Sequence, residues 1–545
     1  MSNLSELINE YLALCRERLQ PLLDRWPWSE IAANPAPEFR AVFAGTERSQ
    51  EFLAAARAFD EFVSEARGGD EPVFEGAERC RHFWHFKAFV WNAGVYDDLI
   101  CCRPVHGHQV EEMIGRELAR NDVVFRHAAF LESFACPGDV DVGDFQVRHL
   151  TDEEVHEVFE GRCRLDRHET ESAIRDALKN KWFAVVRGVA RPLEDRLVFE
   201  GAIGLHDFTM TPFRDINLGL NLFKASAGPV VIRRTFHWNS SVFYRRIREY
   251  PQHSDDLFPS TWSGPDDPPP MRLYRLDAGD SQRLPVFWNE FKHTHVENAK
   301  FLPSYVHRAI DRFLRACKAR RTDWEFCQLL YVMALEALFS GEDDDKVRPT
   351  KTILKEGKQV EVSVGVMETI AKCCATLVAP QEAGVVPIRE WLFSIYKQRS
   401  RLAHASTFEQ EEFFAQPQCP DEHTEAISLC NLLGVDTSPV VEGPDMEFAV
   451  LHNVVRMSLL FFVGRTAGAV AHGLRTQTND APPEQRGSDG AGESGRQEQR
   501  DRLEHAHLAL KRDVLRQLYD CHQRRDETWR RDLRSSSGLF LRWGG

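Results

Sequence analysis

The sequence lacks any uncharged apolar run of about 18 residues, the length that a membrane-spanning helix requires. The largely apolar run from Met457 to Val463 is too short to cross a bilayer. The N-terminus also lacks the charged-then-apolar pattern of a secretory signal, because Glu6 and Glu10 fall within its first turns. These absences predict a cytoplasmic protein without membrane contact.

Familiar cofactor and metal motifs are absent as well. The chain contains no Gly-x-x-x-x-Gly-Lys-Ser/Thr phosphate loop, no Gly-x-Ser-x-Gly nucleophile elbow and no Cys-x-x-Cys pair. Cysteines and histidines do gather between residues 80 and 108, but their spacing fits an aromatic-rich helical core better than a zinc finger. The 13 cysteines are typical of reduced thiols in a cytosolic protein. We therefore expect no cofactor and no metal.

Composition indicates a large globular protein. Hydrophobic residues make up 43% and charged residues 28% of the 545 residues, so the chain can form about three or four domains. The net charge of −15 argues against a protein that coats nucleic acid along its whole surface. A local basic site remains compatible with this charge.

The pattern of apolar and polar residues changes along the chain and predicts a multidomain α+β protein. Helical periodicity is expected at 4–19, 51–67, 82–90, 303–319, 323–340, 361–379, 386–404 and 448–472, and strands at 145–150, 183–186, 197–199, 218–223 and 230–232. The expected organisation is a helical N-terminal region at 1–140, an α/β or β-rich module of unassigned role at 141–290, an all-α helical bundle at 291–475, a disordered linker at 476–500 and a helical tail at 501–545.

The segment from Tyr396 to His404 carries the side chains best suited to chemistry. It places a tyrosine, two arginines, a serine and a histidine at the end of the predicted 386–404 helix. A histidine transfers protons near neutral pH, and an arginine binds a phosphate and the charge that develops on it. RNA supplies its own nucleophile, the 2′-hydroxyl, so such a set can cut RNA without a metal.

Helical geometry alone leaves this interpretation open. Ser400 and His404 are about 40° apart on the helix, and Arg399 lies about 100° from Ser400. Arg399 and His404 therefore converge only through long side chains, an unwound last turn or a second copy of the helix. Spacing alone favours a structural alternative, in which basic residues complement the helix dipole.

The order of motifs along the chain favours the catalytic interpretation over the structural one. The segments 331–339 and 395–404 resemble the Apea-like branch of the HEPN superfamily, in which an Ala-Leu-Glu-Ala-Leu helix precedes a Tyr-x-x-Arg-Ser-x-x-x-His-Gly helix. The Arg312-Phe313 pair and the helix expected over 361–377 complete the set. The resemblance covers about residues 300–475. Ala405 stands where glycine is usual, which should affect the turn more than the chemistry.

The resemblance implies a HEPN-like helical bundle that forms a homodimer, with the Arg–His motifs at the dimer interface. It further implies a metal-independent ribonuclease of antiviral defence, abortive infection or toxin–antitoxin action, with a possible trigger or antitoxin partner. Arg399 and His404 would be the catalytic pair and Ser400 the polar position that follows the arginine. Glu336 would orient Arg399 or His404. A purely structural Glu336 is an equal alternative, and Tyr396 would pack over Arg399 or donate to a phosphate.

Basic residues on the preceding helix suggest an RNA contact. Arg308, Arg312 and Arg315 share a helix face, and Arg401 adds a cation beside the motif. A solvated helix face explains the same pattern. Two functions therefore stay open: an endoribonuclease, and a non-catalytic RNA- or nucleotide-binding dimerisation or scaffold protein.

Overall fold

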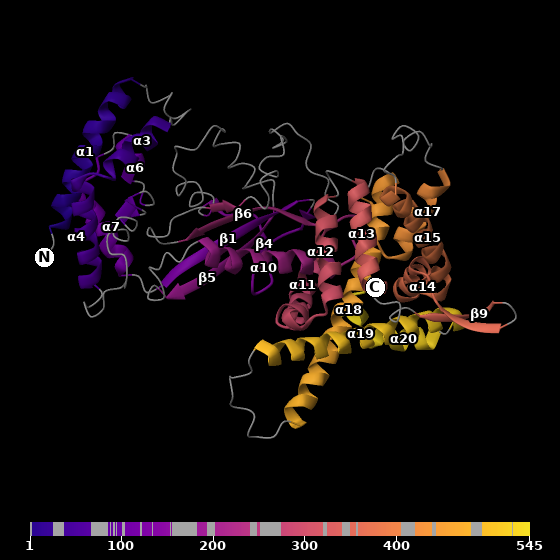
Figure 1. Ribbon diagram of the computed structural model, residues 1–545. Helices are drawn as coiled ribbons and strands as arrows, with labels where there is room; N and C mark the ends of the chain where they lie inside the picture. Colours follow the sequence, from indigo (N-terminus) through magenta and orange to yellow (C-terminus); the bar gives the residue numbers. More distant parts are fainter. Residues whose placement is uncertain are drawn as a thin grey trace. The chain divides into compact units, whose positions relative to one another are not determined.

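The computed structural model describes the chain in two compact units (Figure 1). The first comprises 1–131, 138–209 and 232–269, and the second 132–137, 210–231 and 270–545. The described residues within them are 3–25, 37–66, 86–87, 89–90, 93, 95–100, 104–119, 122–132, 134–152, 154, 183–192, 202–239, 248–250, 274–319, 324–340, 349–355, 358–404, 420–438, 443–480, 493–525 and 527–544. The fold is mostly helical with a small antiparallel sheet region, consistent with the expected α+β class.

The first unit contains a helical part with an aromatic core. Tyr11 and Tyr96 are buried there and their hydroxyl oxygens are 2.5 Å apart. Glu47 is also buried, and its carboxylate is neutralised by an ion pair with Lys87. The helices, which include the predicted 4–19 and 51–67 segments, are α1 (Leu4–Arg25), α3 (Pro37–Thr46), α4 (Gln50–Ala66), α6 (Val95–Ile100) and α7 (Gly107–Leu118).

The sheet has six strands in the order β3-β4-β5-β1-β6-β7. Strands β1 and β5 pair in antiparallel fashion, from Asp122 opposite Pro192 to Phe130 opposite Ala184. Strand β1 begins inside the 1–140 region that was expected to be helical, so the β-rich part starts earlier than the predicted boundary at 141. The strands are β1 (Asp122–Glu132), β3 (Val140–Asp141), β4 (Gln146–Arg148), β5 (Ala184–Pro192), β6 (Val231–Asn239) and β7 (Arg248–Tyr250). The predicted strand at 197–199 lies outside the described residues.

The strand prediction at 218–223 was wrong. These residues form the last turns of helix α10 (Ala202–Phe223). A short apolar run does not distinguish a strand from a helix that is buried on all sides, and Leu218, Leu220 and Leu222 are all buried. Asn221 closes the end of the helix, since its side chain donates to the carbonyl of Val230 at 2.8 Å and accepts from its N–H at 3.0 Å.

The second unit is a helical assembly around α18 (Gly443–Asp480). Its segment Met446–Thr466 is long and apolar enough to cross a membrane, but it is almost entirely buried inside the protein, as is typical of a core helix. The predicted helices at 303–319, 323–340 and 386–404 are present, whereas the one expected over 361–379 begins after a strand. The elements are α11 (Ala278–Phe291), α12 (Ser304–Ala319), α13 (Trp324–Phe339), β9 (Thr350–Lys355), β10 (Lys358–Ser363), α14 (Val366–Val378), α15 (Glu382–His404) and α17 (Pro420–Leu432).

The C-terminal segment is part of this unit. Helix α18 runs to Asp480 and α19 (Glu493–Arg524) begins well before 501, so the described ends of the predicted 476–500 linker are helical. Two short helices follow, α20 (Glu527–Ser535) and α21 (Gly538–Trp543). Arg534 of α20 donates to the carbonyl of Leu377 at 2.6 Å, which fixes the end of α14. The segment expected to be a tail therefore packs against the bundle.

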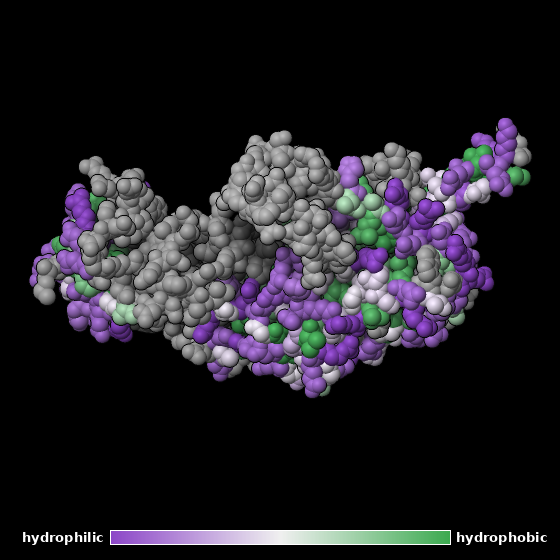
Figure 2. Space-filling model, turned by 90° about the horizontal axis from the view of Figure 1, so that it is seen from below, coloured by the Kyte–Doolittle hydropathy of each residue, from purple (hydrophilic) through white to green (hydrophobic). Residues whose placement is uncertain are grey.

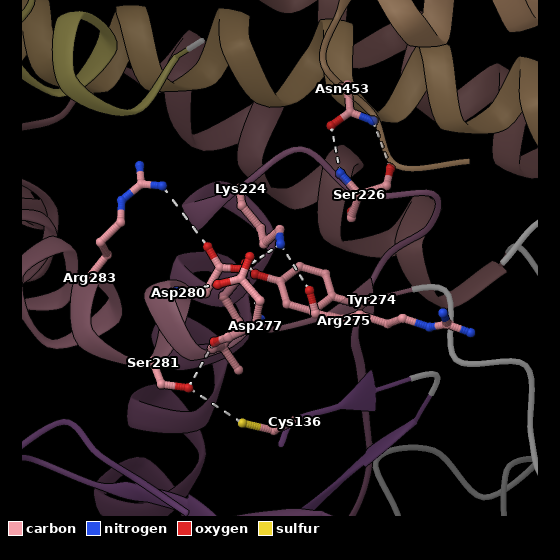
Figure 3. Close-up of polar contacts among 11 residues, drawn as sticks. Cys136, Lys224, Ser226, Tyr274, Arg275, Asp277, Asp280, Ser281, Arg283 and Asn453 are labelled. Atoms are coloured by element: carbon pink, nitrogen blue, oxygen red, sulfur yellow. Dashed lines mark hydrogen bonds and ion pairs between the residues drawn. The ribbon is translucent and has the colours of Figure 1, made fainter. Parts of the chain in front are cut away.

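A polar junction joins the end of α10 to α11 and α18 (Figure 3). Lys224 donates to the carbonyl of Arg275 at 2.9 Å and pairs with the buried carboxylate of Asp280. Asn453 exchanges two hydrogen bonds with the backbone of Ser226, at 3.2 and 2.8 Å. Because the lysine and the carboxylate neutralise each other, this cluster is a structural contact between helices.

The surroundings of His522 in this unit lower its pKa strongly. His522 of α19 lies 3.2 Å from the Thr376 hydroxyl, measured to its Nδ1 atom. Burial, together with the charges of Lys372, Arg389 and Arg525, lowers the pKa of His522 to about 4. The unfolded chain has a histidine pKa of about 6.5 and therefore binds more protons between these two values.

The contribution of neutral His522 to the stability of this unit should therefore be fully present above about pH 6.5. It should decline as the pH falls towards about 4. In a His522→Gln variant, the drop in melting temperature between about pH 7.5 and about pH 5 should be smaller by about 2–4 °C. Thermal unfolding followed by circular dichroism measures this difference. The exposed His505 on the same helix provides the matched control, and an equal effect of His505→Gln would contradict the assignment.

Candidate functional site

The motif residues fall on neighbouring helices of the second unit (Figure 1). Arg312 lies on α12, Glu336 on α13, and both Tyr396 and Arg399 on α15. Helices α12 and α13 pack closely against each other, as do α14 and α15. The motifs that follow one another in the sequence therefore lie on helices that pack against one another.

Glu336 and Tyr396 are in direct contact although 60 residues separate them in the sequence. The Tyr396 hydroxyl donates to Oε1 of Glu336 at 2.5 Å. Both side chains are half-buried, so the hydrogen bond to the carboxylate is partly shielded from water. It joins α15 to α13 one helical turn before Arg399. Two of the predicted supporting residues are thus brought together.

Arg399, Ser400, Arg401 and His404 occupy the last two turns of α15, which ends at His404. Their side chains lie outside the described part of the chain, so the structure gives only their backbone positions. The C-terminal end of a helix carries partial negative charge and favours cationic side chains. The position of this basic cluster at the end of α15 therefore fits both a structural role and a catalytic role.

The sequence did not predict that α19 would support the helix of Glu336. Lys511 is buried, and its ammonium donates to the carbonyls of Ala337 and Ser340 at 2.7 and 2.5 Å. The Ser340 hydroxyl in turn donates to the Glu336 carbonyl at 2.8 Å. The sequence signal for this contact was a lysine within an apolar helix face, next to Leu510 and one turn before Val514.

The α12 arginines differ in their surroundings. Arg312 donates to the carbonyl of Met333 at 2.8 Å and so joins α12 to α13. Arg315 is exposed and pairs with Asp311 at 3.0 Å, while Arg308 is exposed. Of the predicted stripe, Arg308 and Arg315 face solvent, whereas Arg312 forms a contact between helices.

The described residues contain no group of three or more His, Cys, Asp or Glu side chains that could hold a metal ion. Comparison with protein-family models, with curated proteins and with solved structures gives no match for this chain.

The Tyr396–Glu336 contact can be tested by removing one hydroxyl. Tyr396→Phe should lower the free energy of unfolding by about 1.5 kcal/mol, because a carboxylate loses a charge-assisted hydrogen bond. Urea denaturation measures the change. Tyr305→Phe is the matched control, since the buried Tyr305 hydroxyl has no hydrogen-bond partner among the described residues. Equal stability losses in both variants would show that the contact contributes nothing.

Proposed function

We propose that this protein is a metal-independent endoribonuclease of the HEPN type that acts in antiviral defence, abortive infection or a toxin–antitoxin pair. The observation that carries the proposal is the ordered motif set on packed helices, joined by the hydrogen bond between Tyr396 and Glu336. This bond connects the two segments on which the resemblance depends. The net charge of −15 is compatible with a local basic site at the end of α15.

The proposed reaction uses the hydroxyl that RNA itself carries. The 2′-oxygen attacks the adjacent phosphorus and the bond to the 5′-oxygen breaks, which leaves a 2′,3′-cyclic phosphate and a 5′-hydroxyl. A base takes the proton of the 2′-hydroxyl and an acid returns one to the leaving 5′-oxygen. His404 performs this proton transfer, and Arg399 binds the phosphate and stabilises the charge that develops on its oxygens.

A second copy of the chain supplies the other half of the site in this proposal. One histidine does not serve easily as both acid and base in one step, and Arg399 and His404 are not on one stripe of α15. A homodimer that juxtaposes two α15 ends provides two histidines and two arginines. Ser400 and Arg401 then lie within the same composite site, and Tyr396 positions the last turns of α15 through Glu336.

The chemistry of the products tests the proposal. Wild-type protein is incubated with total RNA in EDTA, and the ends of the fragments are analysed. The proposal predicts fragments with 2′,3′-cyclic phosphate and 5′-hydroxyl ends, and full activity in the chelator. Cleavage that depends on an added divalent ion, or fragments with 5′-phosphates, would contradict it.

The alternative of a binding or scaffold protein predicts a different result. RNA would be bound in EDTA but left intact, and Arg399→Ala would weaken the binding by removing a phosphate contact. Under the nuclease proposal, Arg399→Ala instead loses cleavage. The same two proteins in one assay therefore separate the two functions.

A further inference from the structure

The hairpin formed by β9 and β10 projects from the helical bundle of the second unit (Figure 1), and a protrusion is visible on the corresponding side of this unit in Figure 2. Its two strands form a separate two-stranded antiparallel sheet, with Lys358 opposite Lys355 and Ser363 opposite Thr350. Nearly all of its described residues are exposed, and Leu354 retains 75% of its accessible surface. We call this hairpin the arm.

The two faces of the arm differ in charge. Side chains alternate between the faces of a strand, and residues directly opposite each other share a face. One face carries the Lys355–Lys358 pair at the tip, then Ile353 opposite Val360, and then Lys351 at the base. The described strand residues of this lysine face include no carboxylate, and Glu356 and Gly357 connect its two tip lysines in the sequence.

The opposite face is neutral or acidic. It presents Thr352 opposite Glu361, and Leu354 opposite Gln359. The Thr350 hydroxyl contacts the Glu361 carboxylate on this side. The positive charge of the arm is therefore confined to the lysine face.

Two lysines lie directly opposite each other at the tip of the lysine face. Like charges placed directly opposite each other on a sheet destabilise the strand pair, and Lys355 and Lys358 are both exposed. An isolated two-stranded hairpin is itself only marginally stable in water. An anion held between the two ammonium groups would relieve the repulsion.

The base of the arm is anchored to the bundle. Lys351 pairs with Glu368 of α14 at 2.6 Å, and Lys372 pairs with the same carboxylate at 2.6 Å. Burial opposes ionisation of Glu368, but the hydrogen bonds from both lysines hold its pKa below the usual value. Helix α14, which receives this anchor, packs directly on α15.

We propose that the arm is an RNA-binding element in which Lys355 and Lys358 hold a backbone phosphate and Ile353 and Val360 lie against the neighbouring nucleotide. This inference rests on the proposed function, and it extends the substrate contact beyond the end of α15. Two exposed lysines that lie directly opposite each other are complementary to a phosphate of a polyanion. The lysines occupy the tip and the apolar pair lies behind them, an order that suits a phosphate backbone better than insertion into a lipid bilayer.

The test measures binding separately from cleavage. A fluorescently labelled RNA is titrated with protein in EDTA, with His404→Ala as the background so that the RNA stays intact. In this background, Lys355→Ala with Lys358→Ala should weaken binding by at least about tenfold near 100 mM salt. The slope of log Kd against log salt should fall by about 0.7–0.9, which corresponds to one lost phosphate contact.

Two matched controls accompany the double variant. Thr352→Ala with Gln359→Ala alters the opposite face of the same arm and should leave Kd unchanged. Arg512→Ala with Arg516→Ala removes the same charge from the exposed surface of α19 and should change Kd much less. Circular dichroism establishes that each variant is folded.

The outcomes separate the arm from the proposed nuclease. Absence of RNA binding by the His404→Ala protein, or an unchanged Kd and salt slope in the lysine variant, overturns the arm proposal even if the wild type cleaves RNA. Lysine-dependent binding without any cleavage by the wild type supports the arm and removes the nuclease. Lysine-dependent binding to vesicles containing phosphatidylserine but not to RNA would assign the arm to membranes and overturn the proposal.

Discussion

Replacing Arg456 by methionine is expected to lower the free energy of unfolding by about 3 kcal/mol. Arg456 of α18 is buried, and its guanidinium donates to the carbonyls of Leu222 and Trp543 at 3.1 Å each and of Gly544 at 3.4 Å. Methionine fills a similar volume but leaves three backbone acceptors without this donor, and each lost hydrogen bond costs about 1 kcal/mol. The guanidinium therefore fixes the ends of α10 and α21 to the core helix.

The cost of burying the Arg456 cation partly offsets the stability gained from its three hydrogen bonds. Desolvation lowers the pKa of Arg456 to about 10, which still leaves the group charged at neutral pH. The ends of helices carry partial negative charge, which compensates a buried cation in the same way as an acid would. Urea denaturation measures the loss, with Arg516→Met on the exposed surface of α19 as the control. A loss in the Arg456 variant no larger than in the control would contradict this role.

The second large effect concerns His404. His404→Ala should lower the rate of RNA cleavage by about 10²- to 10⁴-fold, the usual contribution of general acid–base catalysis. Because His404 ends α15, the substitution should leave the fold and the affinity for RNA nearly unchanged. Single-turnover cleavage with protein in excess measures the chemical step. His505→Ala on α19 is the control, and a similar loss in both variants would show that His404 has no special role.

Local sequence patterns predicted the helices around the candidate site well. The structure places α12, α13 and α15 within a few residues of the predicted 303–319, 323–340 and 386–404 segments, of which 303–319 has the strongest apolar periodicity. Periodicity succeeds for α12 because this helix buries one face against its neighbours. The 218–223 run failed because α10 is buried on every side at that point, which removes the periodic signal.

Other features depend on contacts that no local pattern records. The arm was missed because 361–363 was assigned to a helix, although Thr350–Lys355 and Lys358–Ser363 form two complete strands. The packing of α19 against the bundle depends on such contacts, among them that of Lys511, which reaches the end of α13 across more than 170 residues. The contact of Tyr396 with Glu336 likewise depends on tertiary packing, although the resemblance had singled out both residues.

The most direct test of the proposed function is RNA cleavage in EDTA by the wild-type and His404→Ala proteins, with the fragment ends identified. The predicted result is metal-independent cleavage by the wild type, 2′,3′-cyclic phosphate ends, and a loss of at least about 100-fold in the variant. RNA cleavage that continues at the wild-type rate in His404→Ala would contradict the account.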